Sequence, residues 1–367
     1  MADIFIEKDG FKPTSDIDKE LEEILKKQGA RIKVVGCGGG GGNSVSRMKE
    51  TGIKGCEIIA INTDAQDLLY SNADHKILIG RELTHGLGAG SNPKIGEQAA
   101  KESELEIKKK LGEVDMVFIT CGLGGGTGTG SAPVVAEIAK KLGALTIGVV
   151  TLPFTVEGQK RIENAQYGLE RMISVTDTLI VIPNDKLLEI APDLPIHTAF
   201  KVADEILTNS VKGITELITK AGLVNLDFAD VRAVMCNGGV SLIGIGESDL
   251  ANDRAKDAVE KAINNPLLDV DITNATGVLV NIIGGNDMSL DEYRNVMEVI
   301  GSKASQTAKI ISGAQISPDM EKTMRVLIIA TGVKSSQILG ASTELSGKQQ
   351  YELGEELGID FFEGGDD

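Results

Sequence analysis

The stretch Gly124-Gly-Gly-Thr-Gly-Thr-Gly130 lies between an apolar run, Met116–Thr120, and a helical pattern at Ala132–Leu142. Glycines packed this densely bring the backbone close to a ligand or hold it at positive φ. Backbone amides at a helix N-terminus bind phosphate. The stretch lacks the lysine of the P-loop pattern GxxxxGK[ST], so it offers phosphate no side-chain cation. We therefore expect a phosphate site built from backbone amides.

A second glycine cluster occupies Val35–Ser44 and includes five consecutive glycines, Gly38–Gly42. Gly36, Gly38 and Gly41 match the dinucleotide fingerprint GxGxxG, although a run of glycines matches many patterns. A tight strand-to-helix turn would not need five glycines. Two amide-rich loops suit an oligophosphate, with a metal ion neutralising the remaining charge.

Short β-branched runs separated by helical patterns predict an α/β fold with a parallel, doubly wound sheet that is covered on both faces. The glycine clusters follow the first and fourth runs, at the strand ends where such sheets bind ligands. The predicted strands are Ile32–Val35, Glu57–Asn62, Lys76–Ile79, Met116–Thr120, Leu145–Thr151 and Thr178–Ile182, and the helices between them are Ser44–Glu50, Pro93–Leu111, Ala132–Leu142 and Glu157–Ile173.

A long helical pattern from His197 to Lys220 is apolar around much of its circumference, so we expect it to be buried between two bodies. The pattern beyond it predicts a smaller α/β domain, with strands at Val231–Met235, Gly277–Ile283, Lys309–Ile311 and Val326–Ala330 and helices at Arg254–Asn264 and Leu290–Ser302. The expected domains are an N-terminal extension (1–30), a nucleotide-binding domain (31–196), a central helix (197–220), a C-terminal domain (221–332) and a flexible acidic tail (333–367).

Composition excludes several classes of function. The net charge of −17 over 367 residues repels nucleic acids and anionic lipids. The four cysteines form no CxxC pair, which favours small buried hydrophobic residues in a reducing cytosol over a metal or redox site. No apolar run is long enough to span a bilayer, and the N-terminus does not resemble a signal peptide. We expect a cytoplasmic protein with no membrane insertion and no nucleic-acid partner.

Six ordered motifs make the chain resemble the tubulin/FtsZ family over roughly residues 30–332. GGGTGTG is the tubulin signature, and its surroundings, Thr120–Pro133, look like FtsZ. The other motifs follow in the order of that family: Asn62–Gln66, Gly86–Pro93, Pro153–Gly158 with Arg161, Ile182–Asp185 and Asn225–Asp230. The resemblance implies a GTP-binding domain, a central helix and a C-terminal domain that activates the GTPase. Whether the chain is an archaeal-type member, or the main division protein rather than a paralogue, stays open.

The resemblance also implies which residues bind GTP or GDP. Mg²⁺ would be bound mainly through the phosphates, and a monovalent cation such as K⁺ is a further candidate. Phosphate-binding residues would be Gly39, Gly40, Gly41, Gly42, Asn43, Gly126, Thr127 and Gly128, while Ala89, Gly90, Ser91 and Asn92 would close over the γ-phosphate. Glu157 and Arg161 would contact ribose and phosphate, although their spacing alone favours an i,i+4 salt bridge on a solvated helix face.

Asn184 and Asp204 would recognise guanine, with Phe200 packed on its face. A carboxylate accepts two hydrogen bonds from guanine N1–H and its 2-amino group, whereas adenine presents an acceptor at the first position. Many bacterial members carry Asn where this chain has Asp204. Without the resemblance, Asp204 would be read as an exposed acidic helix position and Phe200 as a core residue.

By the same resemblance, Asp227 and Asp230 would orient the attacking water, with Asn225 in support, in the nucleotide site of the next subunit. A lone DxxD is otherwise usually a solvated turn. The predicted helix would span roughly 36 Å, too far for Asp227 to fold back to the phosphates of its own chain. The implied function is a GTPase that assembles head to tail into protofilaments of the division ring at mid-cell.

The implied partners include other division proteins and a membrane anchor of unknown identity. The DIPAFLR-like peptide with which bacterial members bind membrane anchors is absent, and Leu357–Phe362 is a candidate for the same purpose.

Two other classes of function compete with an assembling GTPase. An NAD-dependent dehydrogenase leaves GGGTGTG unexplained and has no convincing catalytic histidine, and a non-hydrolysing tubulin relative is disfavoured by the intact Asn225, Asp227 and Asp230.

Overall fold

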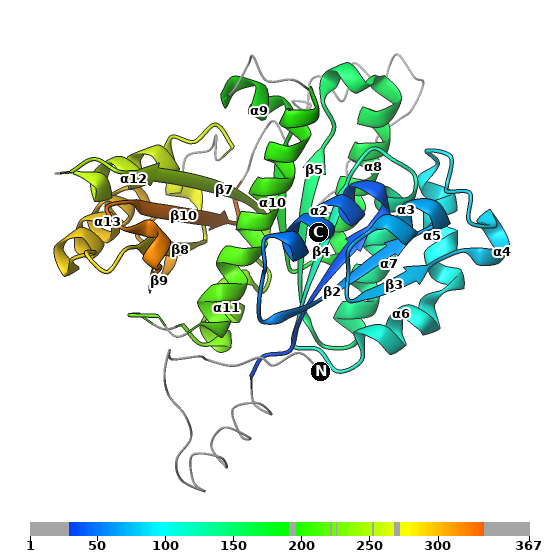
Figure 1. The fold of residues 1–367 in the computed structure, drawn as a ribbon, viewed down its shortest axis with the longest axis horizontal. Helices are drawn as coiled ribbons and strands as arrows, with labels where there is room; N and C mark the ends of the chain where they lie inside the picture. Colours follow the sequence, from blue (N-terminus) through cyan, green and yellow to red (C-terminus); the bar gives the residue numbers. More distant parts are fainter. Residues whose placement is uncertain are drawn as a thin grey trace, which may run out of the picture. The chain divides into compact units, whose positions relative to one another are not determined.

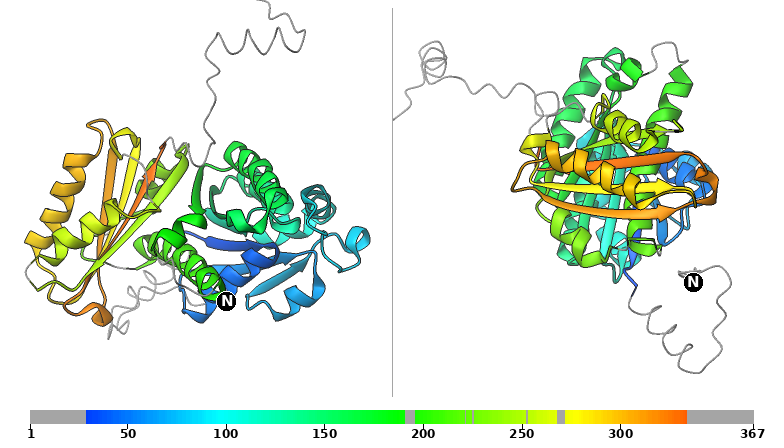
Figure 2. Two further views of the ribbon diagram at one scale, coloured as in Figure 1. Left: turned by 90° about the horizontal axis from the view of Figure 1, so that it is seen from above. Right: turned by 90° about the vertical axis from the view of Figure 1, so that its left-hand side faces the viewer.

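The computed structural model describes residues 29–190, 196–220, 222–224, 226–251, 253–267 and 272–333. Asn225, the segment Leu357–Phe362, and nearly all of the predicted N-terminal extension and tail lie outside these residues. In the described part, ten strands form one sheet in the order β3-β2-β1-β4-β5-β6-β7-β10-β8-β9 (Figures 1 and 2).

The first six strands pair in parallel, as the unalternating apolar runs predicted. The strand order runs outward from β1 in one direction and from β4 in the other, so the switch point of the sheet lies between β1 and β4. Their bounds are β1 Ile32–Cys37, β2 Cys56–Asn62, β3 His75–Leu78, β4 Met116–Gly122, β5 Leu145–Leu152 and β6 Thr178–Pro183.

The connecting helices differ from expectation in three places. Helices α2 and α7 begin inside the glycine clusters rather than after them, and the predicted Pro93–Leu111 helix is divided at Ser103. Glycine lets α2 approach the sheet closely, since a Cβ on Gly41 would lie 2.5 Å from the carbonyl oxygen of Thr120. The helices are α2 Gly38–Glu50, α3 Ala65–Tyr70, α4 Arg81–Thr84, α5 Pro93–Glu102, α6 Glu104–Leu111, α7 Thr127–Lys141, α8 Gln159–Val175 and α9 Asp185–Ile190.

The long helix α10 (Ile196–Thr219) is buried along most of its length, which confirms the prediction for it. It packs against α2 and β5 on one side and against β8 and β9 on the other (Figure 1). Val211, Ile214 and Leu217 belong to an apolar core that continues into β1, β4, β8 and β10. Asn281 of β8 also donates a 3.2 Å hydrogen bond to the carbonyl oxygen of Gly213.

The part of the chain after α10 corrects one predicted strand. Val231–Met235 is helical, because apolar residues recur at helical spacing and the side chain of Asp227 caps the helix at the amide of Asp230. The strand here is β7, whose glycines and serines weaken its β pattern. The elements are α11 Phe228–Met235, β7 Gly239–Ser248, α12 Arg254–Ile263, β8 Gly277–Gly284, α13 Leu290–Lys303, β9 Lys309–Ile316 and β10 Met324–Thr331.

Strand β7 joins the two halves of the sheet. It pairs in parallel with β6 over Thr178–Ile180 and antiparallel with β10, which in turn is antiparallel to β8. The sheet is therefore continuous from the nucleotide-binding half into the C-terminal half.

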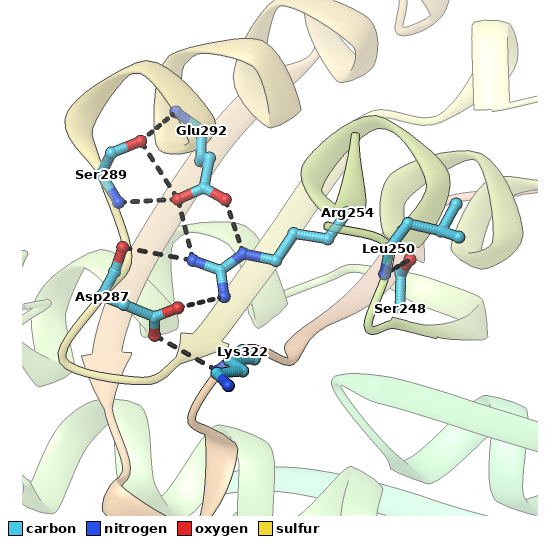
Figure 3. Close-up of polar contacts among 7 residues, drawn as sticks. All are labelled: Ser248, Leu250, Arg254, Asp287, Ser289, Glu292 and Lys322. Atoms are coloured by element: carbon cyan, nitrogen blue, oxygen red, sulfur yellow. Dashed lines mark hydrogen bonds and ion pairs between the residues drawn. The ribbon is translucent and has the colours of Figure 1, made fainter. Parts of the chain in front are cut away.

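A buried arginine links α12 to α13 in the C-terminal half. The guanidinium of Arg254 pairs with carboxylates of Asp287 and Glu292, each at 2.6 Å, and Glu292 forms a reciprocal helix cap with Ser289 (Figure 3). These contacts lower the pKa of Glu292, mainly through the hydrogen bond from Arg254. The network is structural and fixes the start of α13.

Candidate nucleotide-binding site

A cavity of about 350 Å³ opens at the carboxyl ends of β1 and β4, at the switch point of the sheet. Residues from both glycine clusters, from α8 and from the first half of α10 line it. Those named from the sequence are Gly39, Gly40, Asn43, Gly126, Thr127, Gly128, Glu157, Arg161, Asn184, Phe200 and Asp204.

The two glycine clusters touch each other at the floor of the cavity. A Cβ on Gly38 would lie 2.6 Å from the amide nitrogen of Gly128, and a Cβ on Gly40 would lie 3.2 Å from that of Gly122. Gly38 also has a φ of +70°. Side chains at these positions would separate the loops, so the glycines allow two helix starts to share one small site.

Those helix starts, α2 and α7, carry unneutralised partial positive charge. Neither N-cap residue, Cys37 or Gly126, caps its helix with a side-chain hydrogen bond, and neither helix has an acidic residue in its first turn. Uncapped amides and the helix dipole both favour an anion. The two helix starts therefore offer an anion a local attraction despite the net negative charge of the protein.

Six of the predicted phosphate residues do not line the cavity. Gly41 and Gly42 are buried, with Gly41 packed against Thr120 and Gly42 against Ser71. Residues Ala89, Gly90, Ser91 and Asn92 form a loop that packs against Gly126, where a Cβ would lie 2.7 Å from the amide nitrogen of Asn92. This loop reaches the cavity only through Gly126.

Glu157 and Arg161 form an ion pair with each other and also line the cavity. Glu157 is further held by the amide of Phe154, which donates to it at 2.9 Å. The i,i+4 pair that spacing alone suggested is therefore present with Arg161 exposed to solvent, and both of its residues also line the cavity. Arg161 is the one cation among the described lining residues.

Phe200 and Asn184 leave ligand-binding groups unused. Phe200 is 41% exposed although it contacts Phe154 edge-to-face, with ring centroids 5.3 Å apart, so it is not a core residue. Asn184 is 4% exposed, and its amide oxygen has no hydrogen-bond partner among the described residues. A flat aromatic surface and an unsatisfied buried polar atom suit a polar planar ligand.

Asp204 lies on α10 and accepts a 2.6 Å hydrogen bond from the hydroxyl of Ser44. Burial raises the pKa of Asp204, while the hydrogen bond from Ser44 and the charge of Arg47 oppose that rise. Its carboxylate is partly buried at the cavity wall, rather than exposed as its sequence neighbourhood suggested.

The proposed catalytic acids are not part of this cavity. Asp227 and Asp230 are exposed at the start of α11, which follows the opposite end of α10 (Figure 1). Asp227 accepts a 2.8 Å hydrogen bond from the amide of Asp230. The helix rises about 1.5 Å per residue, so roughly 22 Å separates Asp204 from Thr219 along its axis.

Several lining residues were missed by sequence reasoning, among them Cys37, Ser44, Thr151 and Ala203. Ser44 lies two residues after the glycine run, so its position was a usable signal, whereas Thr151 and Ala203 sit in ordinary apolar patterns. Burial raises the pKa of the Cys37 thiol to about 12, which fits the expected inert, buried cysteine.

The described residues contain no group of three His, Cys, Asp or Glu side chains that could hold a metal ion. None of the described helices combines the length and apolar character needed to cross a membrane.

Two family models match the chain: the GTPase domain of the Tubulin/FtsZ family over residues 31–192, and the C-terminal domain of the FtsZ family over residues 239–334. Cell division protein FtsZ 1 of Thermococcus kodakarensis is 62% identical over 332 residues, covering 90% of this chain and 88% of that protein. The same-named protein of Pyrococcus furiosus is 62% identical over 326 residues, covering 89% and 87%.

The fold has a solved counterpart at similar identity. A structure of Methanocaldococcus jannaschii FtsZ, described as an empty dimer, superposes with a TM-score of 0.82 at 61% identity and covers 87% of this chain and 92% of its own. With both domains matched in order and the glycine loops at the switch point, the chain belongs to the tubulin/FtsZ family.

Proposed function

We propose that this protein binds GTP in the cavity between its two glycine loops and hydrolyses it only when a second copy supplies Asp227 and Asp230. It would assemble head to tail into protofilaments of the division ring in the cytoplasm at mid-cell. The observation that carries the proposal is the separation of two parts of one reaction: the anion-binding helix starts lie at one end of α10, and the acids lie at the other.

The triphosphate would be held by amides rather than by lysines. The uncapped starts of α2 and α7 face one cavity, with Arg161 as the nearby cation. With no carboxylate cluster for a metal among the described residues, Mg²⁺ would be coordinated mainly through the phosphates, and K⁺ is a further candidate ion. A bound Mg²⁺ would neutralise phosphate charge and stabilise the charge that develops during transfer.

Guanine would lie against Phe200 and meet Asp204 and Asn184. The free amide oxygen of Asn184 and the carboxylate of Asp204 are both acceptors, and guanine offers donors at N1 and at its 2-amino group. Adenine has neither donor at these positions, which gives the site a chemical basis for preferring GTP to ATP.

Asp227 and Asp230 would position the attacking water. Both are exposed, and the hydrogen bond from the amide of Asp230 to Asp227 holds the first carboxylate at a helix N-terminus. Phosphoryl transfer depends mainly on positioning and electrostatics, so two carboxylates around a water can suffice. A head-to-tail contact does not close on itself and therefore yields a filament.

The proposal is tested by phosphate release and light scattering with GTP, GDP, ATP and NAD over a range of protein concentrations. We expect scattering with GTP, and turnover per subunit that rises steeply from near zero as protein concentration increases. Turnover that stays constant on dilution would mean that one chain holds a complete site. Equal responses to GTP and ATP would contradict the guanine assignment.

The cellular arrangement is part of the same proposal. Other division proteins and a membrane anchor would recruit the filament, since the described part of the chain has no spanning helix of its own. The relatives from Thermococcus and Pyrococcus are named cell division proteins, which supports a role in division.

A further inference from the structure

A buried asparagine on α8 connects the Ala89–Asn92 loop to the Gly124–Gly130 loop, which lies far from it in the sequence. The side-chain nitrogen of Asn164 donates one hydrogen bond to the carbonyl oxygen of Ser91 at 3.0 Å and another to that of Gly124 at 3.1 Å. Asn164 is 7% exposed and does not line the cavity. Neither glycine pattern pointed to it.

The chemistry of the two partners fixes the orientation of the amide. Both are backbone carbonyl oxygens, which only accept hydrogen bonds, so the nitrogen of Asn164 must face them. The nitrogen has two hydrogens, and each is used once. No other uncharged side chain of this size presents two donors on a single atom.

The two loops also touch each other beside this asparagine. Gly126 packs against the backbone of Ser91 and Asn92, and a Cβ on Gly96 would lie 2.4 Å from the carbonyl oxygen of Gly126. The Gly124–Gly130 loop also contains an internal hydrogen bond, in which the amide of Gly124 donates to the hydroxyl of Thr129 at 2.9 Å. The Ala89–Asn92 loop therefore cannot move while the Gly124–Gly130 loop stays in place unless these contacts break.

Asn164 belongs to a stripe of α8 that faces these elements. Gly168, one turn later, packs against Thr129 and Leu123, and Arg171 forms an ion pair with Glu97 of α5. That ion pair holds the pKa of Glu97 down to about 2, first through the hydrogen bond from Arg171. Arg171 thus fastens α8 to α5, whereas Asn164 fastens α8 to the two loops.

We propose that Asn164 is a positioning residue that makes the Ala89–Asn92 loop and the Gly124–Gly130 loop respond to the γ-phosphate as one unit. The inference rests on the proposed function and on closure of the Ala89–Asn92 loop over the γ-phosphate. A contact made by the γ-phosphate at either loop would then stabilise the other through the shared amide. Asn164 would set how strongly the site distinguishes GTP from GDP, without touching the nucleotide.

The test uses the full chain with Asn164→Leu, which removes both donors at similar volume, and Asn164→Asp, which replaces them with a carboxylate. Affinities for GDP and for a non-hydrolysable GTP analogue are measured by competition against a fluorescent nucleotide. Since each lost hydrogen bond is worth a factor of about five, the preference for the analogue over GDP is expected to fall about fivefold or more.

The matched control is Arg171→Met, which breaks the ion pair between α8 and Glu97 of α5 and leaves the hydrogen bonds from Asn164 to both loops in place. It should lower the melting temperature, yet leave the ratio of the two affinities unchanged. If the Asn164 variants lower only the melting temperature, as this control does, the asparagine has a purely structural role and the inference is wrong. If the wild type does not bind GTP, the proposed function fails instead.

A measurement on the wild type covers the case in which both variants fail to fold. Amide hydrogen exchange is compared between the protein bound to GDP and the protein bound to the GTP analogue. We expect the added phosphate to slow exchange both in the Gly88–Asn92 segment and in the Leu123–Gly126 segment. A change confined to one of them would overturn the proposal.

Discussion

The hydroxyl of Ser44 donates a 2.6 Å hydrogen bond to the carboxylate of Asp204, joining helix α2 to the long helix α10. The bond fixes a carboxylate whose burial raises its pKa at the wall of the cavity. It also orders one of the two acceptors that guanine would meet.

Removal of that carboxylate should weaken guanine recognition. We expect Asp204→Ala to lower GTP affinity by about tenfold or more, because a base with two donors loses a charged acceptor. ATP affinity should change much less, so the GTP-to-ATP preference should shrink. Competition titrations with both nucleotides measure it.

Glu205 provides the matched control for Asp204. It is the next residue on the same helix and is exposed, so Glu205→Ala removes the same charge from the same region without touching the cavity wall. Its GTP-to-ATP preference should equal that of the wild type. An Asp204→Ala protein that keeps the wild-type preference would contradict the assignment.

The hydrogen bond from Ser44 should appear in the pH dependence of binding. Guanine recognition needs the ionised carboxylate, so GTP affinity should fall as the pH falls through the pKa of Asp204. Loss of a donor disfavours the ionised form, so Ser44→Ala should move this fall to higher pH. Affinity measured from pH 4 to 8 in both proteins, at about constant ionic strength, reports the shift.

The sign for stability is opposite to that of a salt-bridged carboxylate. Because the folded-state pKa of Asp204 is raised above its unfolded value, ionisation of this group costs folding free energy above the unfolded pKa. Asp204→Asn should therefore increase the stability of the ligand-free protein near neutral pH while weakening GTP binding. If GTP affinity falls at the same pH in Ser44→Ala as in the wild type, the hydroxyl of Ser44 does not influence the carboxylate of Asp204.

Gly130 should be a far more sensitive position than Gly301, although both lie in helices. A Cβ there would lie 2.0 Å from the carbonyl oxygen of Pro93, where α7 crosses the start of α5. We expect Gly130→Ala to destabilise the protein by about 2 kcal/mol or more through overpacking. Gly301, inside α13, has no atom within 4 Å of a Cβ, so Gly301→Ala should stabilise by up to about 1 kcal/mol. Urea unfolding of both variants measures the difference, and equal effects would refute the close-contact explanation.

Much of the nucleotide-binding half could be predicted from sequence because its signals are local. The parallel strands are short, mostly apolar runs rich in β-branched residues, and both glycine clusters follow a strand. The approach of Gly38 to Gly128 could not be predicted, since it depends on the order of strands in the sheet rather than on either segment alone. The bridging role of Asn164 was hidden for the same reason.

The C-terminal half was harder to predict because its elements carry mixed patterns. Val231–Met235 is β-branched and apolar enough for a strand, but Asp227 caps a helix there. Strand β7 contains glycines that suit a turn by local preference and are accommodated by pairing with β6 and β10. The position of Asp227 and Asp230 outside the cavity agrees with the length of α10, which the sequence did predict.

The acidic C-terminal segment should be dispensable for assembly. The matched FtsZ family domain ends at residue 334, and the last strand of the sheet ends at Thr331. A chain that stops after residue 334 should polymerise with GTP at a critical concentration close to that of the full chain, as judged by sedimentation. Its localisation in cells should be lost, because the truncation removes Leu357–Phe362, the candidate segment for binding the membrane anchor. A truncated chain that folds but does not sediment with GTP would contradict this.

Asp227→Ala should separate assembly from hydrolysis. Its side chain lies outside the cavity of its own chain, so GTP binding and sedimentation with GTP should be retained, while turnover falls by about a hundredfold or more. Loss of the helix cap costs about 1 kcal/mol, and Asp227→Ser keeps a capping hydroxyl while removing the carboxylate. If the carboxylate acts in catalysis, the serine variant is stable but equally inactive. Recovery of activity with serine would mean that Asp227 serves only as a cap.

Mixing a variant of the acids with a variant of the cavity distinguishes a shared site from a complete one. Mixing with wild type does not, because Asp227→Ala keeps a normal cavity, and a cavity of either protein works when its neighbour in the filament is wild type. At fixed total protein, turnover should therefore fall in proportion to the wild-type fraction, and a site complete within one chain would give the same linear fall. The reciprocal variant, Asp204→Ala, has a defective cavity and an intact loop. A mixture of Asp204→Ala with Asp227→Ala should then regain turnover, although each protein alone has little, since the first supplies the acids and the second supplies the cavity. Phosphate release from that mixture decides the matter: activity no greater than the sum of the two separate proteins would show that the cavity and the acids work within one chain.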